Sequence, residues 1–180
     1  MAQPIEHYGP LLEKFLNLRH LDLKDMYERW PIVTRYPMII GDLLKHLTNP
    51  DKLVSLKLPE SFRPSNSLSA AMVKLSNLQE LSAPFSEIVN DAGDMFQALP
   101  QTLRHLEVYQ ASLDTINCLH VLLQEKADGG NWESLACVHL NFATCFTRNS
   151  LKLFESQVMF TALWANARET NVELISKKYH

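Results

Sequence analysis

The chain has 180 residues, of which 46% are hydrophobic and 21% charged, a balance typical of one globular domain with a sizeable core. The formal net charge of −3 at pH 7 provides no electrostatic attraction to nucleic acid or to an anionic membrane surface. Three cysteines are too few, and odd in number, for a disulfide framework.

Targeting and membrane signals are absent from the sequence pattern. The first ten residues, MAQPIEHYGP, have neither a basic start nor an apolar stretch, so we predict no signal peptide. No segment approaches the roughly 18 to 20 consecutive apolar residues of a membrane helix. We therefore expect a cytoplasmic or nuclear protein that binds neither nucleic acid nor a membrane.

The first predicted element is a helix near the N-terminus. Over residues 10–17, Leu11, Leu12, Phe15 and Leu16 recur at helical spacing. We expect residues 1–17 to form a capping helix at the start of the domain.

The dominant pattern after this helix is Leu-x-x-Leu-x-Leu. Its copies begin at Leu18, Leu53, Leu78, Leu103 and Leu135, and a degenerate sixth copy contains Val172 and Leu174. Apolar and polar residues alternate within each copy, which predicts a strand with one buried face and one face in water. The sequence thus predicts about six short strands that share one orientation toward a core.

Helical periodicity marks the segments between these strands. We predict helices over residues 38–47, 67–75, 91–99, 113–127 and 150–167. The fourth of these is followed by Gly129 and Gly130, a typical helix stop signal.

Two further segments, residues 24–37 and 59–66, are predicted loops that contain Pro and Arg. They directly follow the first two strand phrases. They either contact a partner or are packed connectors, with Trp30 and Phe62 in the core.

Strands that alternate with helices fit either a doubly wound sheet or a leucine-rich repeat. The central strands of a doubly wound sheet are apolar on both faces, and a Gly-rich turn binds phosphate there; neither feature occurs here. The first leucines of successive copies are 35, 25, 25 and 32 residues apart, and 25 is within the range of leucine-rich repeats. We predict an α/β fold: a right-handed leucine-rich repeat solenoid with a parallel sheet on its concave side and helices on its convex side. Residues 1–180 would form a single domain of five to six irregular repeats.

Two segments resemble the repeats of one family. LPQTLRHLEV, from Leu99 to Val108, and LSNLQELSA, from Leu75 to Ala83, are similar to the leucine-rich repeats of F-box proteins, particularly fungal ones. In those repeats a helix that ends in Leu-Pro leads into Ser/Thr-Leu-x-x-Leu-x-Leu. The resemblance covers about residues 11–175 and implies substrate recognition for a cullin-type ubiquitin ligase. The chain departs from that family because the three F-box helices do not precede the repeats and the consensus Asn is mostly absent.

Residues between the leucines would face the concave side in three rows. The first row contains His20, Ser55, Glu80, His105, Cys137 and Asn171; the second contains Asp22, Lys57, Ser82, Glu107, His139 and Glu173; the third contains Lys24, Pro59, Pro84, Tyr109, Asn141 and Ile175. Neighbours in a row would lie about 4.8 Å apart.

This surface has mixed charge and one aromatic residue, a composition typical of protein interfaces. The residues predicted to bind a partner are His20, Asp22, Lys57, Glu80, His105, Glu107, Tyr109, His139 and Asn141. We predict a non-enzymatic protein-interaction module that uses the concave face and the loops 24–37 and 59–66. It would need no catalytic residue, metal or cofactor.

Two alternatives follow from other features. The cluster of His105, Glu107, Cys137 and His139 has the residue types of a zinc site or of a hydrolase with a Cys nucleophile, although side chains on a wet sheet face seldom converge. The chain could also be a structural part of a larger scaffold, since the last strand lacks an evident cap. Its edge would then be covered by the final residues SKKYH or paired with another chain.

Overall fold

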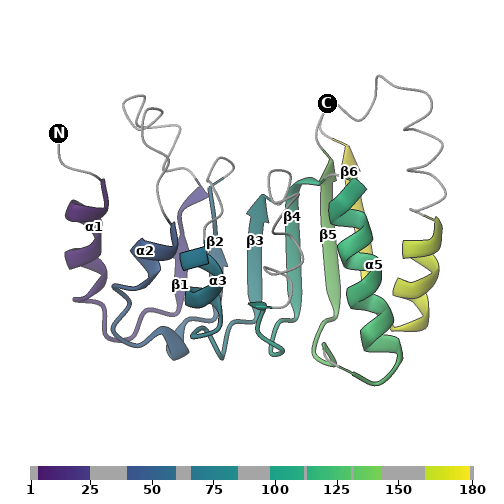
Figure 1. Ribbon diagram of the computed structural model, residues 1–180, viewed down its shortest axis with the longest axis horizontal. Helices are drawn as coiled ribbons and strands as arrows, with labels where there is room; N and C mark the ends of the chain where they lie inside the picture. Colours follow the sequence, from purple (N-terminus) through teal and green to yellow (C-terminus); the bar gives the residue numbers. More distant parts are fainter. Residues whose placement is uncertain are drawn as a thin grey trace.

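The computed structural model describes residues 4–24, 40–59, 66–84, 98–111, 113–130, 132–142 and 161–178. In these residues six strands form one sheet (Figure 1). The strands are β1 (His20–Asp22), β2 (Ser55–Lys57), β3 (Glu80–Pro84), β4 (His105–Ala111), β5 (Cys137–Phe142) and β6 (Glu173–Lys178). All neighbouring strands are parallel, and their order in the sheet is their order in the sequence. The predicted α/β class with repeating strand–helix units is confirmed at this level.

Helices cover one face of the sheet. They are α1 (Pro4–Leu12), α2 (Ile40–Leu44), α3 (Asn66–Met72) and α5 (Leu113–Ala127), and residues 161–169 are also helical. A short 3₁₀ helix, η3 (Pro50–Lys52), precedes β2. Figure 1 shows α2, α3 and α5 on the viewer's side of the sheet. This placement is expected. The connections between successive parallel strands are right-handed crossovers, and each new strand is added on the same side of the previous one, so every helix lies on the same face. None of the described helices is long and apolar enough to cross a membrane.

The core lies between the helices and this face of the sheet. Leu56, Leu81, Leu106, Val138 and Leu174 are aligned across five strands by the pairing register, and all are buried. They belong to the same hydrophobic cluster as residues of α2, α3 and α5. The alternating strand residues point to the opposite side, which we call the polar face. The polar face corresponds to the side that was predicted to be concave.

Helix α5 has the bounds predicted for it, whereas the first helix does not. Helix α1 begins at Pro4 and ends at Leu12 instead of covering residues 10–17. After Leu12 the backbone forms tighter turns, in which Phe15 N–H donates to the Leu12 carbonyl. This change carries Phe15 and Leu16 out of the predicted apolar stripe, and both are exposed.

The other predicted helices are tested in part. Helices α2 and α3 are shorter than predicted because each ends in a turn. Residues 161–167 of the helix predicted over 150–167 are helical, and this helix continues to residue 169. Most of the helix predicted over 91–99 lies outside the described residues.

Most of the two predicted loops, 24–37 and 59–66, also lies outside the described residues. Only Lys24, Pro59 and Asn66 at their ends are described. Trp30 and Phe62, which were predicted either to contact a partner or to pack in the core, lie outside the described residues.

The predicted pairing of the sixth strand is wrong by two residues. Glu173 pairs with Cys137 and Ile175 with His139, where Asn171 and Glu173 were expected. Asn171 instead has a positive φ of 54° and lies in the turn that ends the preceding helix, so the strand begins later. A shift of two residues keeps each side chain on its predicted face. Ser176–Lys178 belong to β6, so these residues extend the edge strand and do not cover it.

Candidate functional site

The Glu107 carboxylate is the centre of a polar network on the polar face. Ser82 Oγ donates a hydrogen bond to Glu107 Oε2 at 2.8 Å, and Asn141 Nδ2 donates one to Oε1 at 3.1 Å. His139 Nδ1 lies 3.7 Å from Oε1. Ser82, Glu107 and His139 are register partners on β3, β4 and β5, so the parallel pairing itself brings them together. The carboxylate is fixed by groups from neighbouring strands, yet 29% of the Glu107 side chain is exposed.

Tyr109 lies beside this network at an irregularity in β4. The pairing of β4 with β5 shifts between Val108 and Ala111, so Tyr109 and Asn141 are not the regular neighbours that the third row predicted. Such bulges reorient side chains. Tyr109 is only 1% exposed, and its hydroxyl has no hydrogen-bond partner among the described residues.

The ionisation of Tyr109 is suppressed by its surroundings. Ser82 and Glu107 lie near enough to affect the phenol, but neither contact has hydrogen-bond geometry. Burial, and then the negative charge of Glu107, raise the pKa of Tyr109. The side chain is therefore a neutral phenol at physiological pH.

Lys24 reaches this site from the β1 end of the sheet. Its Nζ lies 4.5 Å from the centroid of the Tyr109 ring, a cation–π contact. Lys24 follows β1 and Tyr109 belongs to β4, so the contact passes over β2 and β3. Asp22 organises the neighbouring backbone, because its carboxylate accepts the Lys24 N–H at 3.0 Å and pairs with Lys57 Nζ at 3.3 Å.

The predicted partner-binding residues fall into two groups by exposure. Exposed residues on the polar face are His20, Asp22, Lys57, Glu80 and His105. Glu107 and His139 are partly exposed, whereas Tyr109 and Asn141 are buried. In this structure Asn141 therefore supports the network, and the buried Tyr109 ring has the Lys24 ammonium over it.

Sequence reasoning placed Ser82 and Lys24 in the correct rows but did not select them as site residues. Ser82 could have been found from the row that it shares with Glu107. Lys24 could not, because a contact that passes over two strands leaves no signal in residue spacing.

The cluster of His105, Glu107, Cys137 and His139 does not assemble as a metal site. No group of three or more His, Cys, Asp or Glu side chains that could hold a metal is found among the described residues, which include all four. Burial, followed by the charge of Glu173, raises the pKa of the Cys137 thiol. Because the thiolate is the reactive form, this environment makes Cys137 a weak nucleophile at neutral pH.

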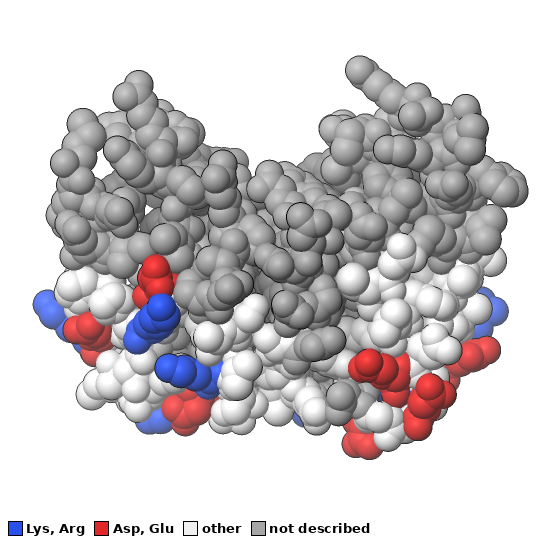
Figure 2. Space-filling view, viewed as in Figure 1, with Lys and Arg blue, Asp and Glu red and all other residues white. Residues whose placement is uncertain are grey.

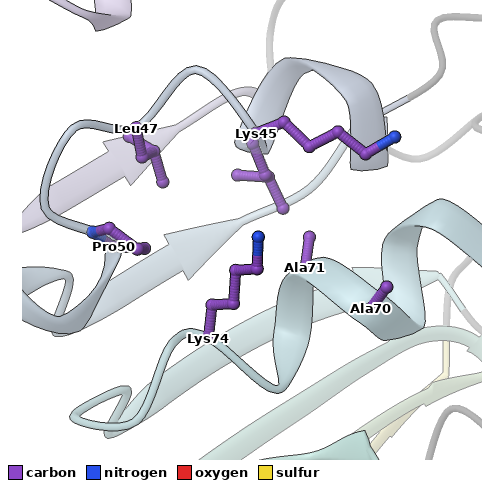
Figure 3. Close-up of a pocket in the computed structure, with 7 residues that line it drawn as sticks. Lys45, Leu47, Pro50, Ala70, Ala71 and Lys74 are labelled. Atoms are coloured by element: carbon purple, nitrogen blue, oxygen red, sulfur yellow. The ribbon is translucent and has the colours of Figure 1, made fainter.

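A pocket of about 280 Å³ lies on the opposite side of the sheet, between α2 and α3 (Figure 3). Its lining is mostly apolar and includes Leu44, Leu47 and Ala71. Lys74 extends toward the pocket, whereas Lys45 points away from it and pairs with Asp42 at 2.6 Å. One cation beside an apolar surface does not make a convergent set of polar groups, so the Glu107 network is the stronger candidate.

Charge on the helix-covered side is unevenly distributed. Figure 2 shows acidic side chains gathered at the β5–β6 end of this side and a mixture of acidic and basic side chains near the α1 end. No large basic surface is visible among the coloured residues. The described part of that side therefore has no basic surface of the kind that binds nucleic acid.

Comparison with family models, curated proteins and solved structures gives no match to this chain. Any function must therefore be inferred from the geometry and chemistry of the polar face.

Proposed function

We propose that this protein is a non-enzymatic module that binds a partner protein through its polar face. The observation that carries this proposal is the combination of an exposed polar row with the fixed Glu107 carboxylate behind it. Because Ser82 and Asn141 already hold Glu107, binding would require little further ordering of that side chain. Helices cover the other face of the sheet, so the polar face is the sheet surface that remains accessible.

We further propose that the strand–helix units form a leucine-rich repeat solenoid. Sequential parallel strands and the aligned buried leucines support this fold. The resemblance to F-box repeats leads us to propose substrate recognition for a cullin-type ubiquitin ligase as the specific form of the function. Contacts through the loops 24–37 and 59–66 remain part of this proposal.

Two other functions have less support. A hydrolase or metal site at His105, Cys137 and His139 is disfavoured by the protonated thiol and by the lack of a ligand group among these described residues. A structural role in a larger scaffold would use the edge strand β6. Light scattering tests that role, because pairing at β6 would give a dimer or larger species.

The main proposal is tested with surface variants that do not disturb the core. The triple variant His20→Ala, Glu80→Ala, His105→Ala removes three exposed side chains from the polar face. The control variant Asn117→Ala, Gln124→Ala, Glu125→Ala removes three exposed side chains from α5. After crosslinking in cells, we expect the proteins captured by the wild type to be lost with the first variant and kept with the second. Equal capture by both variants would exclude the polar face as the binding surface.

A further inference from the structure

We propose that the polar face contains a cation-binding subsite, formed by the Tyr109 ring and the carboxylates of Glu107 and Asp22. Lys24 occupies this subsite in the free protein, and an Arg side chain of a basic partner segment replaces it in the complex. The inference rests on the proposed function and names the chemistry of the partner.

The Lys24 ammonium already marks where a cation sits. It lies over the Tyr109 ring, which is how proteins bind cationic groups, and it forms no ion pair with the described residues. Lys24 lies just beyond β1 and is partly exposed. Its side chain can therefore leave the ring without disturbing a strand.

Two carboxylates belong to the surroundings of the ring. Glu107 precedes Tyr109 by two residues on the same face of β4, and the Asp22 carboxylate accepts the backbone N–H of Lys24, whose ammonium lies over the ring. Asp22 is already paired with Lys57, whereas Glu107 receives two neutral donors and keeps its full charge. A second cation is therefore favoured at Glu107 more than at Asp22.

The site residues also include two buried polar atoms without a hydrogen-bond partner among the described residues. These atoms are Tyr109 Oη and His139 Nε2. His139 Nδ1 lies 3.7 Å from Glu107 Oε1, and a neutral imidazole with its proton on Nδ1 would have Nε2 as its acceptor. Glu107, Tyr109 and His139 thus offer acceptors in one region. A guanidinium group has five N–H donors and no acceptor, so it complements this set better than an ammonium does.

The polar face as a whole carries an excess of negative charge when its histidines are neutral. The described positions of its rows hold four carboxylates, those of Asp22, Glu80, Glu107 and Glu173, and three lysines, Lys24, Lys57 and Lys177, so the excess is one negative charge. That excess favours a basic segment over an acidic one.

The test uses two fluorescein-labelled peptides, Gly-Arg-Gly-Arg-Gly and Gly-Glu-Gly-Glu-Gly, and fluorescence anisotropy at low ionic strength. Removal of the competing ammonium in Lys24→Gln should lower the Kd for the arginine peptide by about three- to fivefold. Loss of the carboxylate in Glu107→Gln should raise that Kd by about tenfold. Lys45→Gln is the matched control, because it makes the same charge change on the helix-covered side.

Equal effects of Lys24→Gln and Lys45→Gln would overturn the inference, as would equal binding of the two peptides or no binding to Lys24→Gln. If Glu107→Gln does not fold, the Tyr109 ring resonances of the wild type serve instead: they should shift with the arginine peptide and not with the glutamate peptide. The two proposals can fail separately. If the peptide test fails but the triple variant of His20, Glu80 and His105 still loses its captured partner, the subsite is excluded and the proposed function is not.

Discussion

At the scale of single residues, Tyr109 is the most unusual side chain in the described structure. It lies on the polar face because it follows His105 and Glu107 in the alternation along β4, and its hydroxyl is buried without a hydrogen bond to the described residues. Such a group normally costs free energy, because it loses its bonds to water and gains none. A cost of this kind is expected where a polar atom serves a ligand.

Removal of this hydroxyl should therefore stabilise the protein. We expect Tyr109→Phe to raise the free energy of unfolding by about 1 kcal/mol, as measured by urea denaturation. Tyr109→Ala, which also removes the ring, should lower it by about 3–5 kcal/mol. A loss of stability in Tyr109→Phe would show that the hydroxyl has a partner in solution.

The pH dependence of stability gives a separate check on Tyr109. An unfolded tyrosine has an ordinary pKa of 10.0, and burial raises the pKa of Tyr109 in the folded protein. Above about pH 10 the unfolded state releases this proton first, so the stability present at lower pH is lost as the pH rises. Urea denaturation between about pH 9 and about pH 11 should show a shallower loss in Tyr109→Phe than in the wild type. Equal slopes would contradict the burial of the phenol.

At the scale of elements, α1 is attached to the segment after α2 by a few specific contacts. His46 Nδ1 and Glu13 Oε1 are 2.7 Å apart, and Thr48 Oγ1 donates to the Glu13 carbonyl at 2.8 Å. The His46 ring also lies against Gly9, where an added Cβ would come within 2.6 Å of His46 Cδ2. Glycine at this position allows the close approach of the ring to the helix.

These contacts predict that the effect of Gly9→Ala on the free energy of unfolding depends on whether His46 is present. With His46 present, Gly9→Ala displaces the ring from Glu13, and this loss should cancel the gain in helix propensity. In a His46→Ala background the same substitution should raise the free energy of unfolding by about 0.5–1 kcal/mol. Urea denaturation of the four proteins measures the coupling, and an equal gain in both backgrounds would contradict the contact.

At the scale of the whole molecule, the buried leucines of the described strands and helices belong to one hydrophobic cluster. The prediction of a single domain over residues 1–180 implies that this core unfolds cooperatively. The slowest amides of β2, at Leu56, and of β5, at Val138, should then exchange hydrogen with the same free energy of opening. Native-state hydrogen exchange measures both, and a difference above about 2 kcal/mol would indicate two independent units.

The strands and their buried face could be predicted from the sequence. Burial of one face makes apolar and polar residues alternate along a strand, and this alternation is visible in the leucine pattern. The sequence also placed α5 correctly because Gly129 and Gly130 end that helix. It misplaced β6 because the turn at Asn171 is set by the end of the preceding helix and not by the Val172–Leu174 pattern. In the site, the row containing Ser82, Glu107 and His139 followed from the repeat, whereas the contact of Lys24 with Tyr109 depends on tertiary structure.

The strand order has a consequence for how the chain folds. Each strand pairs only with the strands next to it in the sequence, and the paired residues differ by 25 to 36 positions, as in Ser55 with Glu80 and Cys137 with Glu173. Loop-closure entropy changes little over this range of lengths. A nucleus formed by any two neighbouring strands can therefore grow toward either end, one strand at a time. The first and last strands lie at opposite ends of the sheet in Figure 1, so the chain never has to bring them together.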